Sequence, residues 1–163
     1  MFRLLGQAMN AQWKSQFDRM VRFLRRVEKE EGDSTAQLDN LFSFFQNCWH
    51  LKDWIKNDDS ISKRVRNAVV REVEHTDRLL YCADLANGSK HLLLKNERRG
   101  AVLWRIDRIT TTDVKTGRIL SESGPILGIA SKHGTPRPYD IVEFAKAAVG
   151  DWEALLKKHG LQR

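Results

Sequence analysis

Apolar residues recur every three to four positions in the first part of the chain, which is the spacing of one face of an α-helix. In residues 10–30 this apolar face consists of Trp13, Phe17, Met20, Val21, Leu24 and Val27. In residues 35–57 it consists of Leu38, Leu41, Phe42, Phe45, Cys48 and Trp49. The second segment also carries Phe44 and Trp54 outside this face, so it is bulky nearly all round. We therefore predict two helices, the second of which is central in a bundle or buried in a dimer.

The helical pattern continues in two shorter segments, residues 61–73 and 77–94. The inward positions of the first are Ile61, Val65, Ala68 and Val69. Those of the second are Leu79, Leu80, Ala83 and Ala86. With the two segments before them, they predict a helical bundle over residues 10–95.

The period of the apolar positions changes from 3.6 to 2 after Gly100, which is typical of extended strands. Residues 113–117 have the composition of a hairpin turn, and two more short extended runs follow it. We therefore predict a small antiparallel β-meander over residues 101–131.

Asp140, followed by Glu143 three residues later, forms a capping box for a last helix over residues 140–159. Its apolar stripe includes Trp152, which we expect to pack on the bundle. The predicted fold class is thus α+β, a mostly helical bundle with a small antiparallel β-meander before the C-terminal helix. A chain of 163 residues suits one such domain, 1–163.

The formal net charge of +7 favours an anionic partner, because Lys and Arg that bind phosphates release condensed counterions. The arrangement of these charges strengthens that interpretation, since one row lies opposite the apolar face of the first helix and a second group lies on the third. The candidate nucleic-acid-binding residues are Arg19, Arg22, Arg26, Lys29, Lys63, Arg64 and Arg66. The alternative is a solvated face, partly neutralised by Asp18, Glu28 and Glu30.

Uncommon polar side chains gather in two helical segments and suggest a candidate catalytic patch. It consists of His50, Asp53, Asp84, Asn87, Lys90 and His91. If the two helix faces meet, a carboxylate-oriented histidine could perform acid–base chemistry, or the group could hold a metal ion. The alternative is that the histidines are hydrogen-bonded and fix helix packing. A di-iron bundle requires Glu-x-x-His pairs on two helices, and the chain has one such pair, Glu72 and His75, so no metal site is predicted.

Four helices with a basic surface, and a polar motif that ends in His on a late helix, resemble the HEPN group of prokaryotic helical proteins. Many members of this group are metal-independent endoribonucleases of toxin and phage-defence systems. The resemblance covers about residues 10–95 and implies RNA cleavage, with His91 as general acid or base. Lys90, Asn87 and Asp84 would then position the substrate or stabilise charge. The family motif places four to six residues between its polar start and His, whereas three separate Asn87 from His91.

The first seven residues have one positive charge, no long apolar run and no small-residue cleavage site. No segment approaches the roughly 18 apolar residues that span a bilayer. We therefore expect a cytoplasmic protein without a membrane partner, and no cofactor is implied. Cys48 and Cys82 have no paired spacing and fit reduced core residues.

Three functions are compatible with these patterns, and they leave open whether the protein is an enzyme. The first is a binding module for an anionic partner, with nucleic acid, and RNA in particular, favoured. The second is a HEPN-like endoribonuclease. The third is an assembly protein that forms a homodimer through Trp49 and Trp54.

Overall fold

The computed structural model describes residues 12–29, 32, 34–88, 101–106, 109–123, 126–131 and 139–162. The helices in these ranges are α2 (Trp13–Glu28), α3 (Ser34–Lys56), α4 (Lys63–Val73), α5 (Asp77–Gly88) and α6 (Ile141–Lys158). Each lies within or close to a predicted helix, although residues 89–94 of the fourth predicted helix fall outside the described ranges. The strands are β1 (Ala101–Ile106), β2 (Ile109–Thr112), β3 (Ile119–Ser123), β4 (Ile126–Ser131) and β5 (Tyr139–Asp140).

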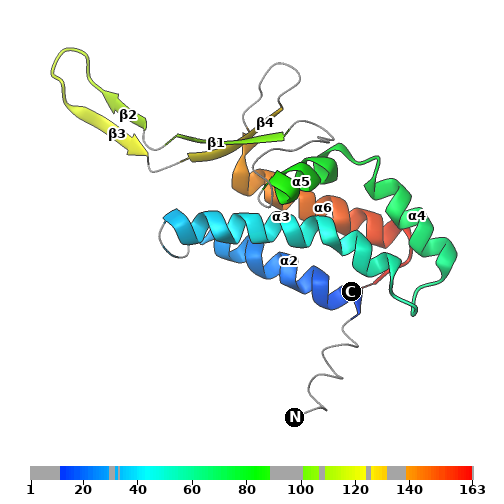
Figure 1. The fold of residues 1–163 in the computed structure, drawn as a ribbon. Coiled ribbons are helices and arrows are strands. Elements are labelled where there is room, and N and C mark those ends of the chain that lie inside the picture. The colour runs from blue at the N-terminus through cyan, green and yellow to red at the C-terminus, as the bar shows by residue number, and fades with distance from the viewer. Residues whose placement is uncertain are drawn as a thin grey trace, which may run out of the picture.

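Helix α3 is the central element, and α2, α4, α5 and α6 all pack against it (Figure 1). Its buried side chains point to several sides, as expected for a helix surrounded by others. They are Leu41, Phe44, Phe45, Cys48, Trp49, Leu51 and Ile55. This arrangement confirms the first of the two predicted alternatives, a helix central in a bundle.

Helix α2 lies antiparallel to α3 and is attached to it by polar contacts as well as by its apolar face. At its start, the backbone N–H of Trp13 donates to Asp58 Oδ2 at 3.1 Å. Further along, Gln16 Nε2 donates to Asn47 Oδ1 at 3.0 Å. Because such bonds require particular positions along both helices, they fix the register of α2 on α3.

Helix α6 returns to the bundle and fills its centre with Trp152, as the sequence predicts. The Trp152 side chain is fully buried, and its Nε1–H donates to the Cys48 carbonyl oxygen at 3.1 Å. The Asp140 half of the predicted capping box is present, since Asp140 Oδ1 accepts from the backbone N–H groups of Val142 and Glu143. The Glu143 carboxylate bonds Lys146.

The predicted fold class, α+β with a β-meander, is wrong. Among the described side chains, every buried one lies in a helix or in the turn between α3 and α4, so the core is helical. The strands form two separate pieces, with order β1-β4-β5 in one and β2-β3 in the other. A meander requires at least three consecutive strands side by side, and no such run occurs among the described strands.

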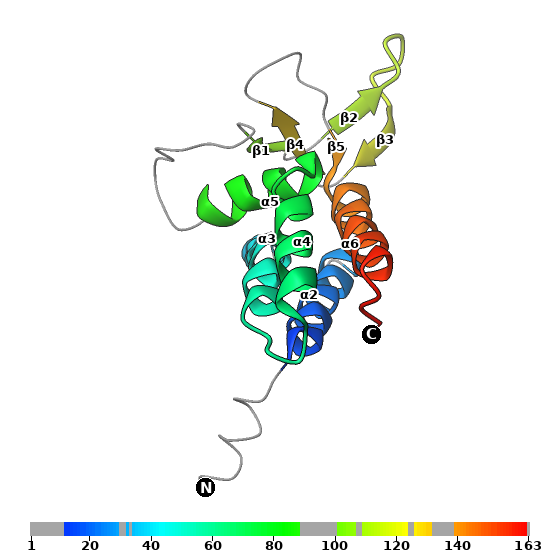
Figure 2. The same ribbon diagram turned by 90° about the vertical axis from the view of Figure 1, so that its right-hand side faces the viewer.

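The error has a physical origin in the difference between local and long-range pairing. The turn at 113–117 is encoded locally, because Asp113 Oδ1 accepts from the backbone N–H groups of Lys115 and Thr116 and Gly117 adopts a φ of +66°. It closes the β2–β3 hairpin, which projects beyond the helices in both views (Figures 1 and 2). β1 pairs instead with β4, which lies after the hairpin, and alternation alone does not choose that partner.

Candidate nucleic-acid interface

The predicted basic row of α2 lies on the surface. Arg19, Arg22, Arg26 and Lys29 are all exposed, whereas the opposite face of the helix is buried in the core. From Arg19 to Arg26 the helix rises about 10 Å, at 1.5 Å per residue. The row is therefore a linear array of cations on a helix whose position is fixed by the bundle.

The arginines of α2 have no carboxylate partners within the part of the chain that the structure describes. No ion pair or side-chain hydrogen bond there involves the guanidinium groups of Arg19, Arg22, Arg25 or Arg26. Arg25 is also exposed, and the sequence interpretation missed it, although its position three residues after Arg22 was a usable signal. Glu28, expected to neutralise this face, has its Oε1 3.6 Å from Nζ of Lys146 on α6.

Two of these guanidinium groups lie over aromatic rings. The Arg19 guanidinium is 5.8 Å from the centroid of the Trp54 ring, and that of Arg26 is 5.2 Å from the Phe23 ring. Attraction to the ring quadrupole holds the cations in place without neutralising them. Trp54, predicted to mediate dimerisation, is thus partly buried beside α2, and its proposed companion Trp49 is only 5% exposed.

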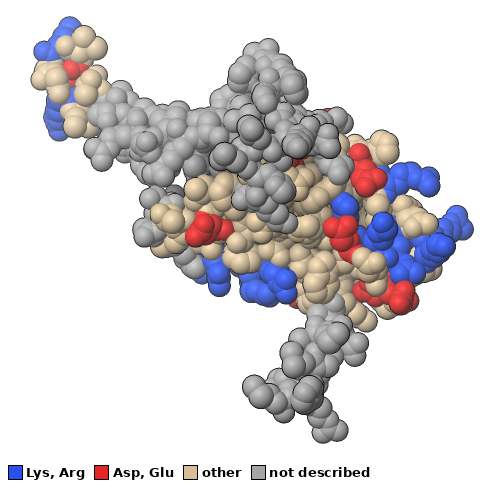
Figure 3. All heavy atoms as spheres, in the orientation of Figure 1, with Lys and Arg blue, Asp and Glu red and all other residues tan. Residues whose placement is uncertain are grey.

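A second group of basic residues lies on α4, but its members differ in their partners. Lys63 and Arg64 are exposed, whereas Arg66 Nη1 donates to Asp59 Oδ1 at 2.8 Å and to the Lys56 carbonyl oxygen at 3.3 Å. Arg66 therefore secures the turn between α3 and α4. In Figure 3, Lys and Arg gather over α4 and along α2, with acidic side chains and uncharged surface between the two groups.

One part of the candidate catalytic patch is assembled on α3. His50 Nδ1 is 3.2 Å from Asp53 Oδ2, and Lys52 Nζ donates to Asp53 Oδ1 at 2.8 Å. Burial alone would raise the pKa of Asp53, but the hydrogen bonds from Lys52 and His50 outweigh it and hold the pKa below its usual value. The Asp53 carboxylate is consequently ionised at neutral pH and orients the imidazole.

The other part of that patch is on α5 and beyond it. Asp84 is 1% exposed and Asn87 is partly buried on α5, which packs against α3. Lys90 and His91 lie outside the described residues, so the expected meeting of His50 with His91 stays a prediction. Within the described ranges, no group of three His, Cys, Asp or Glu side chains has the arrangement of a metal site.

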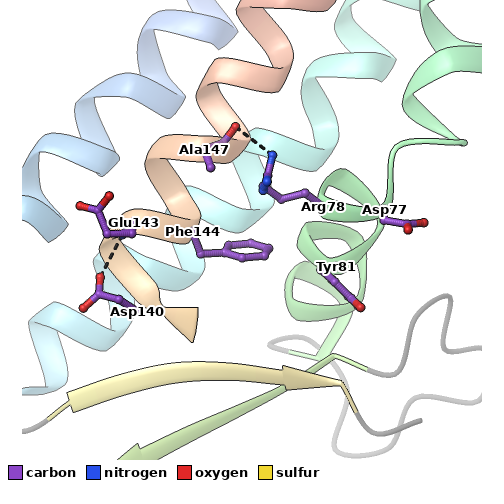
Figure 4. A pocket seen from close by; sticks show the side chains of 7 residues that line it. All are labelled: Asp77, Arg78, Tyr81, Asp140, Glu143, Phe144 and Ala147. Atoms are coloured by element: carbon purple, nitrogen blue, oxygen red, sulfur yellow. Dashed lines mark hydrogen bonds between the residues drawn. The ribbon is translucent and has the colours of Figure 1, made fainter. Parts of the chain in front are cut away.

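A pocket of about 310 Å³ lies between α5 and the start of α6 (Figure 4). Tyr81 and Phe144 form its aromatic part, with ring centroids 6.2 Å apart. Carboxylates surround it, and Arg78 on its wall bonds the Ala147 carbonyl oxygen and Asp151. The acidic lining does not suit a phosphate, so this pocket does not belong to the basic surface. The sequence does not reveal this pocket, because the two helices that line it meet only in the tertiary structure.

No described helix is both long enough and apolar enough to cross a bilayer. The HEPN resemblance stays a prediction, because His91, its proposed catalytic residue, is outside the described ranges. Comparison of the chain with protein-family models, with characterised proteins and with solved structures finds no match.

Proposed function

We propose that this protein binds nucleic acid through the exposed face of α2. The observation that carries the proposal is the set of exposed guanidinium groups without carboxylate partners in the described structure. They belong to Arg19, Arg22, Arg25 and Arg26. Lys63 and Arg64 of α4 form a separate basic group (Figure 3), and Arg66 is engaged with Asp59.

Arginines without carboxylate partners favour phosphate binding because they have less to lose when they bind. An arginine without a carboxylate gives up only water and counterions when it binds a phosphate, while a paired arginine must also leave its carboxylate. The helix supplies rigidity, because its apolar face is held in the core and its side chains therefore start from restricted positions. About four neutralised phosphates would give a log–log salt slope of about −3 to −4.

A binding titration at several salt concentrations tests the proposal. The probe is a fluorescein-labelled oligonucleotide, and the variant is the double substitution Arg22→Gln and Arg26→Gln. We expect the magnitude of the salt slope to fall by about 1.5 to 2, since two phosphate contacts are lost. The matched control is Lys115→Gln with Arg118→Gln, which removes the same charge from exposed positions of the β2–β3 hairpin.

The control variant should retain the slope of the unmodified protein. Absence of binding at low salt would disprove the proposal. An unchanged slope in the α2 variant would locate binding elsewhere, and an equal change in both variants would show a nonspecific effect of net charge.

We propose RNA cleavage as a second candidate function, favoured by one observation. The Asp53 carboxylate lies at hydrogen-bonding distance from His50 Nδ1, and a carboxylate-oriented imidazole suits general acid–base catalysis. Incubation of purified protein with mixed cellular RNA would reveal cleavage in a gel. Loss of cleavage in His50→Ala or His91→Ala would identify the histidine involved, and intact RNA with the unmodified protein would exclude this function under the conditions used.

A further inference from the structure

The cations of α2 are interleaved with aromatic side chains. Arg19, Phe23 and Arg26 are spaced i, i+4 and i+7 and therefore form one row on the helix surface. The Trp54 ring, contributed by α3, lies next to Arg19. Because Trp13 at the start of α2 bonds Asp58, the end of α3 that contains Trp54 lies beside the first half of α2. The order along the surface is thus Trp54, Arg19, Phe23 and Arg26.

The two aromatic residues of this row are not core residues. Among the tryptophans with described side chains, Trp13, Trp49 and Trp152 are at most 5% exposed, whereas Trp54 is only partly buried. Phe23 is likewise partly buried and packs against the core from outside. Each ring therefore contacts the bundle and retains part of its accessible surface.

We infer that the ligand of this surface is single-stranded nucleic acid, whose bases stack on Trp54 and Phe23 while its phosphates contact Arg19, Arg22 and Arg26. The inference rests on the proposed function and specifies its ligand. A duplex encloses its base faces and offers this surface only phosphates, whereas an unpaired strand exposes bases that stack on aromatic rings and guanidinium planes. Alternation of rings and cations matches the alternation of bases and phosphates along such a strand.

The length of the surface formed by Trp54, Arg19, Phe23 and Arg26 also suits a nucleic-acid strand. Arg19 and Arg26 are separated by about 10 Å along the helix axis, and Trp54 extends the row beyond Arg19. An extended chain of about two to four nucleotides covers such a length, since stacked nucleotides rise 3.4 Å each and unstacked ones more. The site is therefore short and independent of base sequence, because every base has a stacking face.

The test compares a 12-nucleotide oligouridylate, a 12-nucleotide oligothymidylate and a 12-base-pair duplex, at one salt concentration, with the full chain. We expect both single strands to bind at least about tenfold more tightly than the duplex and to quench tryptophan fluorescence. A difference between the uridylate and the thymidylate would identify RNA or DNA as the preferred source of the strand.

Substitutions of the rings provide the second arm. Trp54→Leu should weaken single-strand binding about tenfold, abolish most of the quenching and leave duplex binding unchanged. Trp54→Phe, which retains a ring, should restore most of the affinity. Phe23→Leu should have a similar but smaller effect, and it keeps the inference testable if Trp54→Leu does not fold, as judged by circular dichroism.

The outcomes separate this inference from the proposed function. Equal binding of duplex and single strands, together with unchanged binding by Trp54→Leu and Phe23→Leu, would overturn the inference and leave the proposed function standing. Failure of every probe to bind at low salt would overturn both. A loss of duplex and single-strand affinity by the same factor would show that the rings act only by positioning the arginines, which also overturns the inference.

Discussion

The basic residues of α2 and those at the end of α6 differ in their partners. On α2, the guanidinium groups of Arg22 and Arg26 have no carboxylate partner within the described residues. Around α6, Lys158 Nζ lies 2.9 Å from Glu72 Oε1, and His159 Nε2 lies 3.0 Å from the same oxygen. The hydrogen bond from Lys158, together with that from His159, lowers the pKa of Glu72.

The number of basic residues in a region is therefore not enough to identify a binding surface, because their partners must also be known. A cation beside a carboxylate contributes to the attachment of a helix, and its field is largely cancelled at a distance. A cation without such a partner retains its field and its hydrogen-bond donors for a ligand. The four predictions below test this division, which assigns stability to the α6 region and binding to the α2 region.

The largest expected effect is on the stability of the α6 region. Trp152→Ala should lower the free energy of unfolding by about 3–5 kcal/mol, because it leaves a large cavity and an unpaired carbonyl at Cys48. Urea denaturation followed by circular dichroism measures the change. The variant protein that remains folded should bind nucleic acid with an unchanged salt slope. A changed slope would contradict the assignment of binding to α2 and of stability to α6.

A smaller effect, dependent on pH, is expected where α2 is attached to the turn after α3. Burial would raise the pKa of Asp58, but hydrogen bonds from Ser60 and from the Trp13 N–H lower it below the usual value of 3.8. A carboxyl with a lower pKa in the folded state contributes stability above its unfolded pKa, and this contribution is lost as the pH falls through the folded pKa.

Asp58→Asn should therefore lower the free energy of unfolding at pH 7 by about 1–2 kcal/mol and flatten its decline below about pH 4. Urea denaturation at a series of pH values provides the measurement. If the variant and the unmodified protein lost stability in parallel between pH 7 and pH 2, the proposed role of Asp58 would be incorrect.

The third prediction compares the loss of a paired arginine next to α6 with the loss of two arginines on α2. Arg78→Gln removes the ion pair with Asp151 that links α5 to α6, and both side chains are partly exposed. We expect a loss of roughly 1 kcal/mol or less in the free energy of unfolding and no change in the salt slope of binding. Arg22→Gln with Arg26→Gln should show the opposite, a changed slope and an unfolding free energy that stays within about 0.5 kcal/mol.

The smallest expected effect concerns an acidic residue that follows the C-terminal end of the arginine row. Glu28→Gln removes a negative charge two residues after Arg26 and frees Lys146 from one of its two carboxylate neighbours. Because charges within about one Debye length influence each other, affinity for an oligonucleotide should rise about twofold at low salt. The gain should disappear at high salt, and weaker binding would indicate that Glu28 positions the surface.

Residues near one another in the sequence determined the helices, the hairpin turn and the exposure of the basic row. The spacing of Trp13, Phe17 and Met20 defines the buried face of α2, so it also defines the opposite face on which Arg19 and Arg22 lie. The caps behave in the same way, because Asp140 bonds backbone groups only two and three residues away. Such features need no information about the rest of the fold.

Only the tertiary structure decided which side chains meet across elements. It placed Trp54 beside Arg19, paired Arg66 with Asp59, and formed the pocket between α5 and α6. It also paired β1 with β4, so the predicted meander does not form. These contacts depend on the packing of whole helices and on pairing between distant strands. Several alternatives satisfy the same local pattern, and the global fold selects one of them.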